Sequence, residues 1–92
     1  MKKNMDRAKK TLTDVLELPL DVALDLPKIT IIGDMRVEII NHKGIIQYTN
    51  ELIRINTNIG VVKITGNSME IKNILIEEIS IDGSIESVEI IS

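Results

Sequence analysis

The sequence contains no cysteine and a single aromatic residue, Tyr48. Without cysteine, neither disulfides nor a thiolate zinc site can stabilise the fold, and this absence suits a reducing cytoplasm. Without aromatic bulk, the core has to be built from aliphatic side chains, among which isoleucine dominates. Because the β-branched isoleucine side chain favours pleated sheets, the composition predicts a β-rich fold.

Long apolar runs are also absent. No stretch approaches the roughly 18 consecutive apolar residues that a membrane-spanning helix needs, and the N-terminus lacks the uninterrupted apolar segment of a secretory signal. We therefore expect a cytoplasmic protein. At 92 residues the chain has room for one domain, and a domain of this size buries only about 60–65% of its unfolded surface.

Charge divides the chain into a basic leader and an acidic body. Residues 1–10 carry a net charge of +4, whereas residues 11–92 carry −7. Apolar residues in the leader recur at spacings of three and four, which predicts an amphipathic helix within residues 5–16. The apolar stripe of this helix consists of Met5, Ala8, Leu12 and Val15 or Leu16. The basic residues of the leader are Lys2, Lys3, Arg7, Lys9 and Lys10.

We expect the leader to dock on an anionic membrane surface or on an acidic partner, because its stripe can be buried while the basic residues stay charged nearby. The residues predicted to carry this docking are Lys2, Lys3, Arg7, Lys9, Lys10, Met5, Leu12 and Leu16. The alternative is that the stripe packs on the sheet of the same chain.

Pro19 separates the leader, residues 1–18, from a predicted β domain that covers residues 19–92. The residue before a proline avoids the α region, so the helix ends by Leu18. Beyond Pro19 the apolar period changes from helical to two, which indicates strands. The predicted strands are residues 21–26, 28–32, 35–40, 45–48, 52–56, 61–65, 69–71, 74–81 and 85–91. Turn residues separate them, and Asp82-Gly83 predicts a tight two-residue hairpin.

Short strands bounded by turns predict a mainly β fold, in which the N-terminal amphipathic helix precedes an antiparallel β meander arranged as a sandwich or roll. A parallel α/β sheet is excluded because no crossover helix separates the strands. A short β-solenoid with stacked isoleucine ladders is the alternative, although no fixed period recurs in the sequence. Pro27 forms a stiff corner at the entrance to the sheet and leaves Asp25 in solvent.

No group of residues carries a recognisable reaction chemistry. The single histidine, His42, lies in a predicted hairpin tip at residues 41–44, where a solvated turn residue is expected rather than a metal ligand. A serine nucleophile would need a base beside it. The four serines considered for this role are distant from His42 in the sequence, namely Ser68, Ser80, Ser84 and Ser87. The paired acids Glu77-Glu78 and Glu86-Glu89 are typical of the solvent-exposed face of a sheet. We therefore expect no enzyme activity, cofactor, metal site or small-molecule substrate.

Apolar doublets break the alternation inside the predicted strands. The doublets are Ile31-Ile32, Ile39-Ile40, Ile45-Ile46, Val61-Val62, Leu75-Ile76 and Ile90-Ile91. Since successive side chains of a strand point to opposite faces, each doublet places apolar surface on both faces of the sheet. Either the sheet folds over on itself, or the helix or another protein covers it. One short helix cannot cover two faces, so we also expect self-association as a homo-oligomer or a protein partner.

Five blocks of the sequence resemble the YabP/YqfC family of endospore-forming bacteria. The blocks are Asp25-Leu26-Pro27, Ile32-Gly33, Glu38 to Gly44, Leu75 to Ile81 and Gly83-Ser84-Ile85. The likeness extends from Leu16 to Ile90, and its blocks consist of strand and turn residues without a catalytic signature. The resemblance implies a small sporulation protein that is made in the mother cell and needed for spore development, with no catalytic residues to transfer.

Two functions are consistent with these features. The first is a non-enzymatic sporulation protein that acts by protein–protein contact in the mother cell, at or near the membrane that surrounds the forespore. The second is a small nucleic-acid-binding module whose basic leader contacts phosphates. The second is weaker because the sheet offers only Tyr48 for base stacking and the β body is acidic. A nucleic-acid partner is therefore not expected.

Overall fold

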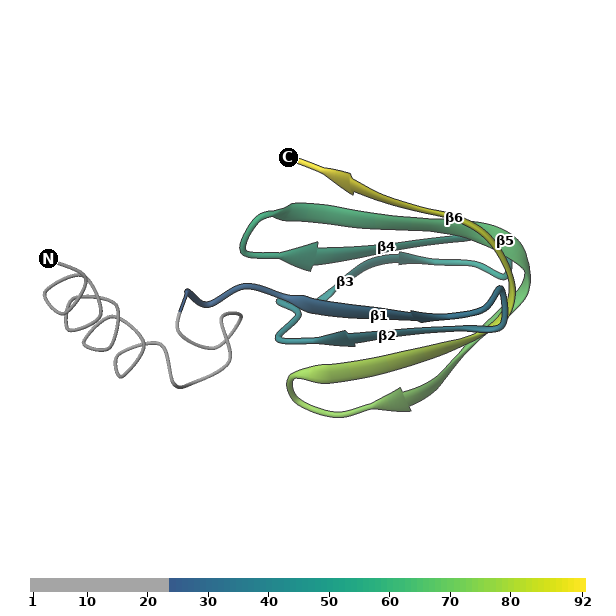
Figure 1. The fold of residues 1–92 in the computed structure, drawn as a ribbon, viewed down its shortest axis with the longest axis horizontal. Coiled ribbons are helices and arrows are strands. Elements are labelled where there is room, and N and C mark those ends of the chain that lie inside the picture. The colour runs from purple at the N-terminus through teal and green to yellow at the C-terminus, as the bar shows by residue number, and fades with distance from the viewer. Residues whose placement is uncertain (1–23) are drawn as a thin grey trace, which may run out of the picture.

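The computed structural model describes residues 24–92, which form six antiparallel β-strands in one sheet (Figure 1). The strands are β1 (Lys28–Ile32), β2 (Arg36–Ile40), β3 (Ile45–Tyr48), β4 (Leu52–Thr57), β5 (Gly60–Ile74) and β6 (Glu78–Ile91). These described residues contain no helix. The helix expected within residues 5–16 lies outside the described residues.

The strands follow the order β1-β2-β6-β5-β4-β3 across the sheet. From β3 to β6, each strand pairs with the next one along the chain, as a meander requires. The β1–β2 hairpin attaches instead to β6, so the predicted meander is interrupted between β2 and β3. Because every pairing is antiparallel and all six strands share one sheet, residues 24–92 do not form the alternative fold, a short β-solenoid.

The sheet bends across its middle into two layers that face each other (Figure 1). β5 and β6 are 15 and 14 residues long and run from one layer into the other. The first layer contains β1, β2, the start of β6 and the end of β5, since β2 pairs with residues 78–82. The second layer contains β3, β4, the start of β5 and the end of β6, since β4 pairs with residues 60–65. The expectation of a mainly β, antiparallel fold is confirmed.

Two glycines permit the bend, because the backbones of β5 and β6 approach too closely there for a side chain. A Cβ atom on Gly66 would collide with the carbonyl oxygen of Ser84. A Cβ atom on Gly83 would lie 2.7 Å from the Cα of Met69, whose side chain is fully buried. The register between β5 and β6 shifts at several points from residue 65 to residue 73, and such bulges bend and twist a strand.

The hairpin predicted at Asp82-Gly83 is wrong, because both residues lie inside β6. The glycine serves the close approach of two strands rather than a reversal of the chain. The chain reverses instead at residues 75–77, between β5 and β6 and inside the predicted strand 74–81. The strand predicted at residues 21–26 is wrong in its described part, since Leu24 and Asp25 form a turn.

Four cross-strand rows of apolar side chains build the core, two in each layer. The rows of the first layer are Ile29-Ile39-Ile79-Ile74 and Ile31-Val37-Ile81-Ile71. The rows of the second layer are Ile45-Ile55-Val62-Ile90 and Tyr48-Ile53-Ile64-Val88. The two inner residues of every row are at most 2% exposed, and together with Met69 they are the buried hydrophobic core of the described chain. The outer residues of the rows lie at the margins of the layers.

Replacing Gly66 with alanine should destabilise the domain by about 3 kcal/mol, because the added methyl group has to displace the backbone of β6. The matched control is Gly33→Ala. The methyl group added there meets nothing within 4 Å, and only the positive φ of +54 is unfavourable for alanine. This substitution should cost about 1 kcal/mol. Urea unfolding of the two variants measures the difference. Equal stabilities would show that the bend does not depend on close approach at Gly66.

Within one core row, the inner and outer isoleucines should differ in their contribution to stability. Ile55→Ala removes a fully buried side chain and should cost about 2–5 kcal/mol. Ile45→Ala, at the edge of the same row, removes a side chain that is 38% exposed and should cost about 1 kcal/mol. Thermal or urea unfolding checks this order, and a larger effect at Ile45 would contradict the assignment of the core.

Candidate protein-interaction surfaces

The outer residues of the core rows lie at free edges of the two layers. Because β2 pairs only with residues 78–82 and β4 only with residues 60–65, the second halves of β5 and β6 are each paired on one side only, which adds two free edges to those of β1 and β3. The row ends at three of these edges, Ile31, Ile74 and Ile90, are 54%, 62% and 53% exposed. A free strand edge beside exposed apolar side chains is a template for pairing with another chain.

Four of the six apolar doublets stay exposed at both residues. The folded-over sheet buries Ile39 and Val62, so one residue in each of these two doublets belongs to the core. The doublets that remain exposed at both positions are Ile31-Ile32, Ile45-Ile46, Leu75-Ile76 and Ile90-Ile91. The fold of residues 24–92 thus leaves apolar surface without cover, a property typical of surfaces that bind other molecules.

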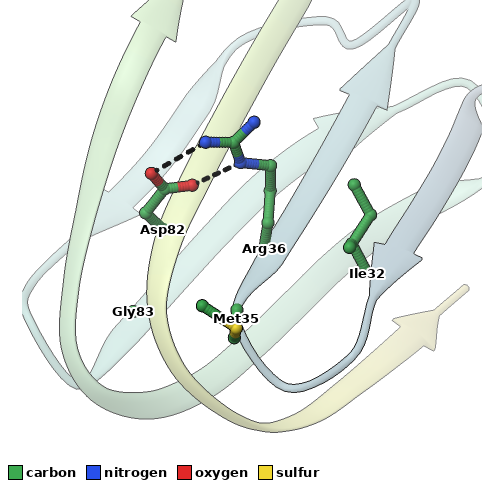
Figure 2. Close-up of a pocket in the computed structure, with 5 residues that line it drawn as sticks. All are labelled: Ile32, Met35, Arg36, Asp82 and Gly83. Atoms are coloured by element: carbon green, nitrogen blue, oxygen red, sulfur yellow. Dashed lines mark hydrogen bonds and ion pairs between the residues drawn. The ribbon is translucent and has the colours of Figure 1, made fainter.

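A shallow groove lies where the sheet bends (Figure 2). Its polar wall is an ion pair in which Arg36 donates two hydrogen bonds to the Asp82 carboxylate, at 2.6 and 3.1 Å. The hydrogen bond from Arg36 lowers the pKa of Asp82, and the pair satisfies both charges within the chain. What the groove offers to a partner is therefore mainly apolar, namely Ile32 and Met35, which are 48% and 69% exposed.

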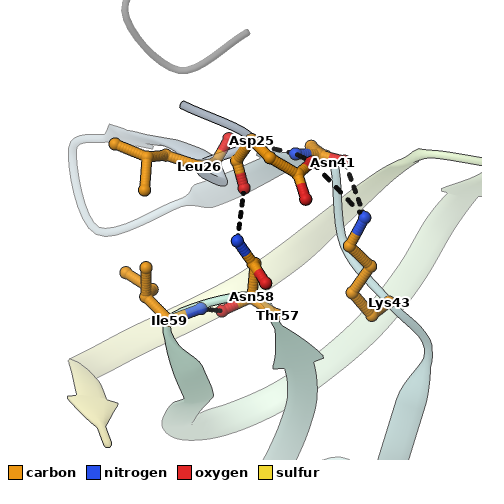
Figure 3. A network of polar contacts seen from close by, with 7 residues as sticks. All are labelled: Asp25, Leu26, Asn41, Lys43, Thr57, Asn58 and Ile59. Carbon is orange, nitrogen blue, oxygen red and sulfur yellow. Dashed lines mark hydrogen bonds and ion pairs between the residues drawn. The ribbon is translucent and has the colours of Figure 1, made fainter. Parts of the chain in front are cut away.

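Asp25 fastens the start of the described chain to two loops (Figure 3). Its carboxylate accepts a hydrogen bond from the Asn41 side chain at 2.8 Å and lies 3.5 Å from the Lys43 ammonium group. Its carbonyl oxygen accepts a hydrogen bond from the Asn58 side chain at 3.2 Å. The hydrogen bond from Asn41, and then the charge of Lys43, lower the pKa of Asp25. Asp25 is exposed, as expected, but its contacts also fix the start of the described chain.

The β5–β6 turn, residues 75–77, lies beside the start of the described chain. The backbone N–H of Asn41 donates to the carbonyl oxygen of Glu77 at 2.6 Å, and the turn is closed by the N–H of Leu75, which donates to the carbonyl oxygen of Glu78 at 2.8 Å. Ile76 at the tip is 95% exposed. A shallow groove along the turn is lined by Leu75, Ile76 and the two glutamates. The turn therefore combines an apolar tip with two carboxylates.

His42 lies in the connection between β2 and β3, which are not neighbours in the sheet, so the predicted hairpin tip at residues 41–44 is wrong. The side chain is half-buried rather than solvated. Its Nδ1 atom accepts the N–H of Gly44 at 3.0 Å, and its Nε2 atom is buried without a hydrogen-bond partner. Within residues 24–92, no cluster of three or more histidine, cysteine or acidic side chains is placed to hold a metal ion.

Several of the serines and acids considered in the sequence contact neighbouring strands instead of forming a group around His42. Ser87 shares a hydrogen bond with Thr65, and Glu86 accepts one from the side chain of Asn67 at 2.8 Å. Both contacts join β5 to β6. These side chains therefore tie the two longest strands together.

The eight residues predicted to dock the leader lie outside the described part of the chain, so this docking stays a prediction. They are Lys2, Lys3, Arg7, Lys9, Lys10, Met5, Leu12 and Leu16. In the part of the chain that the structure describes, no helix is long and apolar enough to cross a membrane.

Sequence reasoning missed the contacts of Arg36 with Asp82 and of Asp25 with Asn41. The partners are separated by 46 and 16 residues, and strand register and the loop connections bring them together. One local signal was present for the second contact. Asn41 has a φ of +68, a conformation that asparagine adopts more readily than most residues, so its place in a tight connection could have been expected.

Comparisons with known proteins agree with the resemblance seen in the sequence. The YabP family model matches residues 25–91, nearly all of the described chain. A protein of Bacillus subtilis (strain 168), named "Uncharacterized protein YqfC", is 39% identical over 88 residues, which cover 96% of this chain and 95% of that protein. No solved structure matches the chain significantly. Since the family model and the relative both extend over most of the sequence, the chain belongs to the YabP family.

Proposed function

We propose that this protein is a non-enzymatic sporulation protein that acts through protein–protein contacts during endospore development. Membership of the YabP family supports the biological setting, because the YabP/YqfC resemblance implies a role in spore formation. The exposed apolar doublets support the mode of action. They leave isoleucine side chains at free strand edges, where a second polypeptide can both add a strand and bury the side chains.

The second polypeptide in this proposal is another copy of the chain or another sporulation protein. Row ends such as Ile45 and Ile90 have core residues as their cross-strand neighbours, Ile55 and Val62. A chain that covers such an end therefore extends an existing core instead of creating an isolated contact. Stable interfaces bury about 1,600 Å² in total, and obligate ones resemble a divided domain core.

The proposed location is the cytoplasm of the mother cell, peripheral to the membrane that surrounds the forespore. The excess positive charge of the leader supports this location without requiring its apolar stripe to enter the membrane, since each basic residue near an anionic membrane surface contributes about 1 kcal/mol.

Replacing the row ends Ile45 and Ile90 with threonine should abolish self-association and leave the fold intact. Threonine keeps the β-branched shape that strands favour but removes apolar surface from two free edges. A matched control carries Asn56→Thr and Glu89→Thr, at exposed polar positions. Sedimentation velocity should show an oligomer for the wild type and for the control, and a monomer for the double isoleucine variant. A wild type that remains monomeric at high concentration would contradict self-association through these edges.

Deleting the gene from the bacterium that carries it should lower the yield of heat-resistant spores and leave vegetative growth unchanged. The reason is that the protein is proposed to act only in the mother cell after sporulation has begun. Counting heat-resistant colonies measures the effect, and restoring the intact gene should reverse it. A normal spore yield in the deletion strain would overturn the proposed role.

A further inference from the structure

The β5–β6 turn is the most exposed apolar feature in the described part of the chain. Ile74, Leu75 and Ile76 are 62%, 57% and 95% exposed in sequence order. Glu77 and Glu78 follow directly, and both are exposed. A chain reversal of this kind usually carries glycine, asparagine or aspartate, whereas this one presents aliphatic side chains to water. Burial of the three side chains would remove apolar surface that nothing in residues 24–92 covers.

The described chain begins beside this turn. Asp25, the second described residue, is hydrogen-bonded to the side chain of Asn41, and the backbone N–H of Asn41 is hydrogen-bonded to Glu77. One residue therefore links the start of the described chain to the backbone of the turn. Seven residues lie between Leu16, at the end of the predicted helix, and Leu24, which gives eight Cα–Cα steps. Such a connection reaches up to about 26 Å when extended, which is sufficient to fold back on the turn.

The leader and the turn are complementary in both polarity and charge. The leader presents the stripe of Met5, Ala8, Leu12 and Val15 or Leu16 beside five basic residues, and the turn presents three aliphatic side chains beside two carboxylates. An anionic bilayer offers apolar depth as well, but it would repel Glu77 and Glu78 as the tip entered. A segment on a short tether also has a high effective concentration, in the millimolar range, so contact within one molecule is favoured over contact between molecules.

We propose that residues 5–16 pack on the β5–β6 turn of the same molecule. Met5, Leu12 and Leu16 cover Leu75 and Ile76, while the basic residues of the leader face Glu77 and Glu78. The leader is then a cover for one apolar surface, and the row ends on the free edges remain open for contacts with other chains. This assigns an occupant to the one exposed doublet that lies in a turn rather than within a strand.

A spin label tests this contact in the full-length protein. The chain has no cysteine, so Thr11→Cys creates a unique attachment site in the leader, outside the apolar stripe. The backbone amide signals of residues 74–78 should lose most of their intensity when the label is paramagnetic and regain it when the label is reduced. The amide signals of β1 to β4 report in the same spectra whether the fold is intact.

Charge reversal supplies the specificity control. The Glu77→Lys, Glu78→Lys variant should restore the intensity of residues 74–78, because it repels the basic leader. Glu51→Lys, at the β3–β4 turn at the other end of the sandwich (Figure 1), should leave the loss of intensity unchanged. If both variants behave alike, the contact does not depend on the acidic side of the turn, and the proposal fails.

Two further samples separate the other possible occupants. In the first sample, spin-labelled protein without ¹⁵N is mixed with ¹⁵N protein that carries no spin label. A loss of amide intensity at residues 74–78 in this mixture would assign the leader to a second copy. In the second sample, phosphatidylglycerol vesicles are added to the spin-labelled ¹⁵N protein. If residues 74–78 are unaffected without vesicles and the leader binds only to vesicles, the leader is a membrane element and the proposed packing is wrong. These measurements on purified protein are independent of the role in sporulation.

Discussion

The inner isoleucines of this sheet leave water because the sheet bends over on itself (Figure 1). Residues 24–92 contain no helix that could cover the inner face, and their fully buried core residues include no aromatic side chain. Each buried isoleucine or valine contributes about 1.5–3 kcal/mol, so covering the inner residues of all four rows is the dominant favourable term. Gly66 and Gly83 matter because they let the two longest strands approach closely where they bend.

The two long strands that carry the bend also create the surfaces for contact. β2 pairs only with the first part of β6 and β4 only with the first part of β5, so the second half of each long strand has a neighbour on one side only. The core rows therefore end in exposed isoleucines at four edges instead of two. The β2–β3 connection, which joins the layers, also lies beside the start of the described chain and beside the β5–β6 turn. Packing and interaction are thus two consequences of one geometric feature.

Alternation and turn residues predicted the strands Lys28–Ile32 and Ile45–Tyr48 with the bounds that the structure shows, because these strands are short and locally determined. The long strands could not be predicted in the same way. Next to Asp82, Gly83 is typical of a hairpin turn in the local sequence. The structure shows instead that glycine is needed because the backbone of Met69 lies too close for a side chain. The turn at residues 75–77 was missed because its aliphatic residues carry strand propensity. The docking residues were proposed from helical spacing, while the Asp25 contacts needed the fold.

The central claim is that the two layers enclose one core, and methyl–methyl nuclear Overhauser effects test it most directly. Val37 and Ile39 of β2 share that core with Ile53 and Ile55 of β4. In a flat sheet of the same strand order, β2 and β4 would be three strand spacings apart, about 14 Å, too far for such an effect. We expect strong cross-peaks between the methyl groups of β2 and β4. Their absence, with the strand pairings intact, would contradict the folded-over sheet.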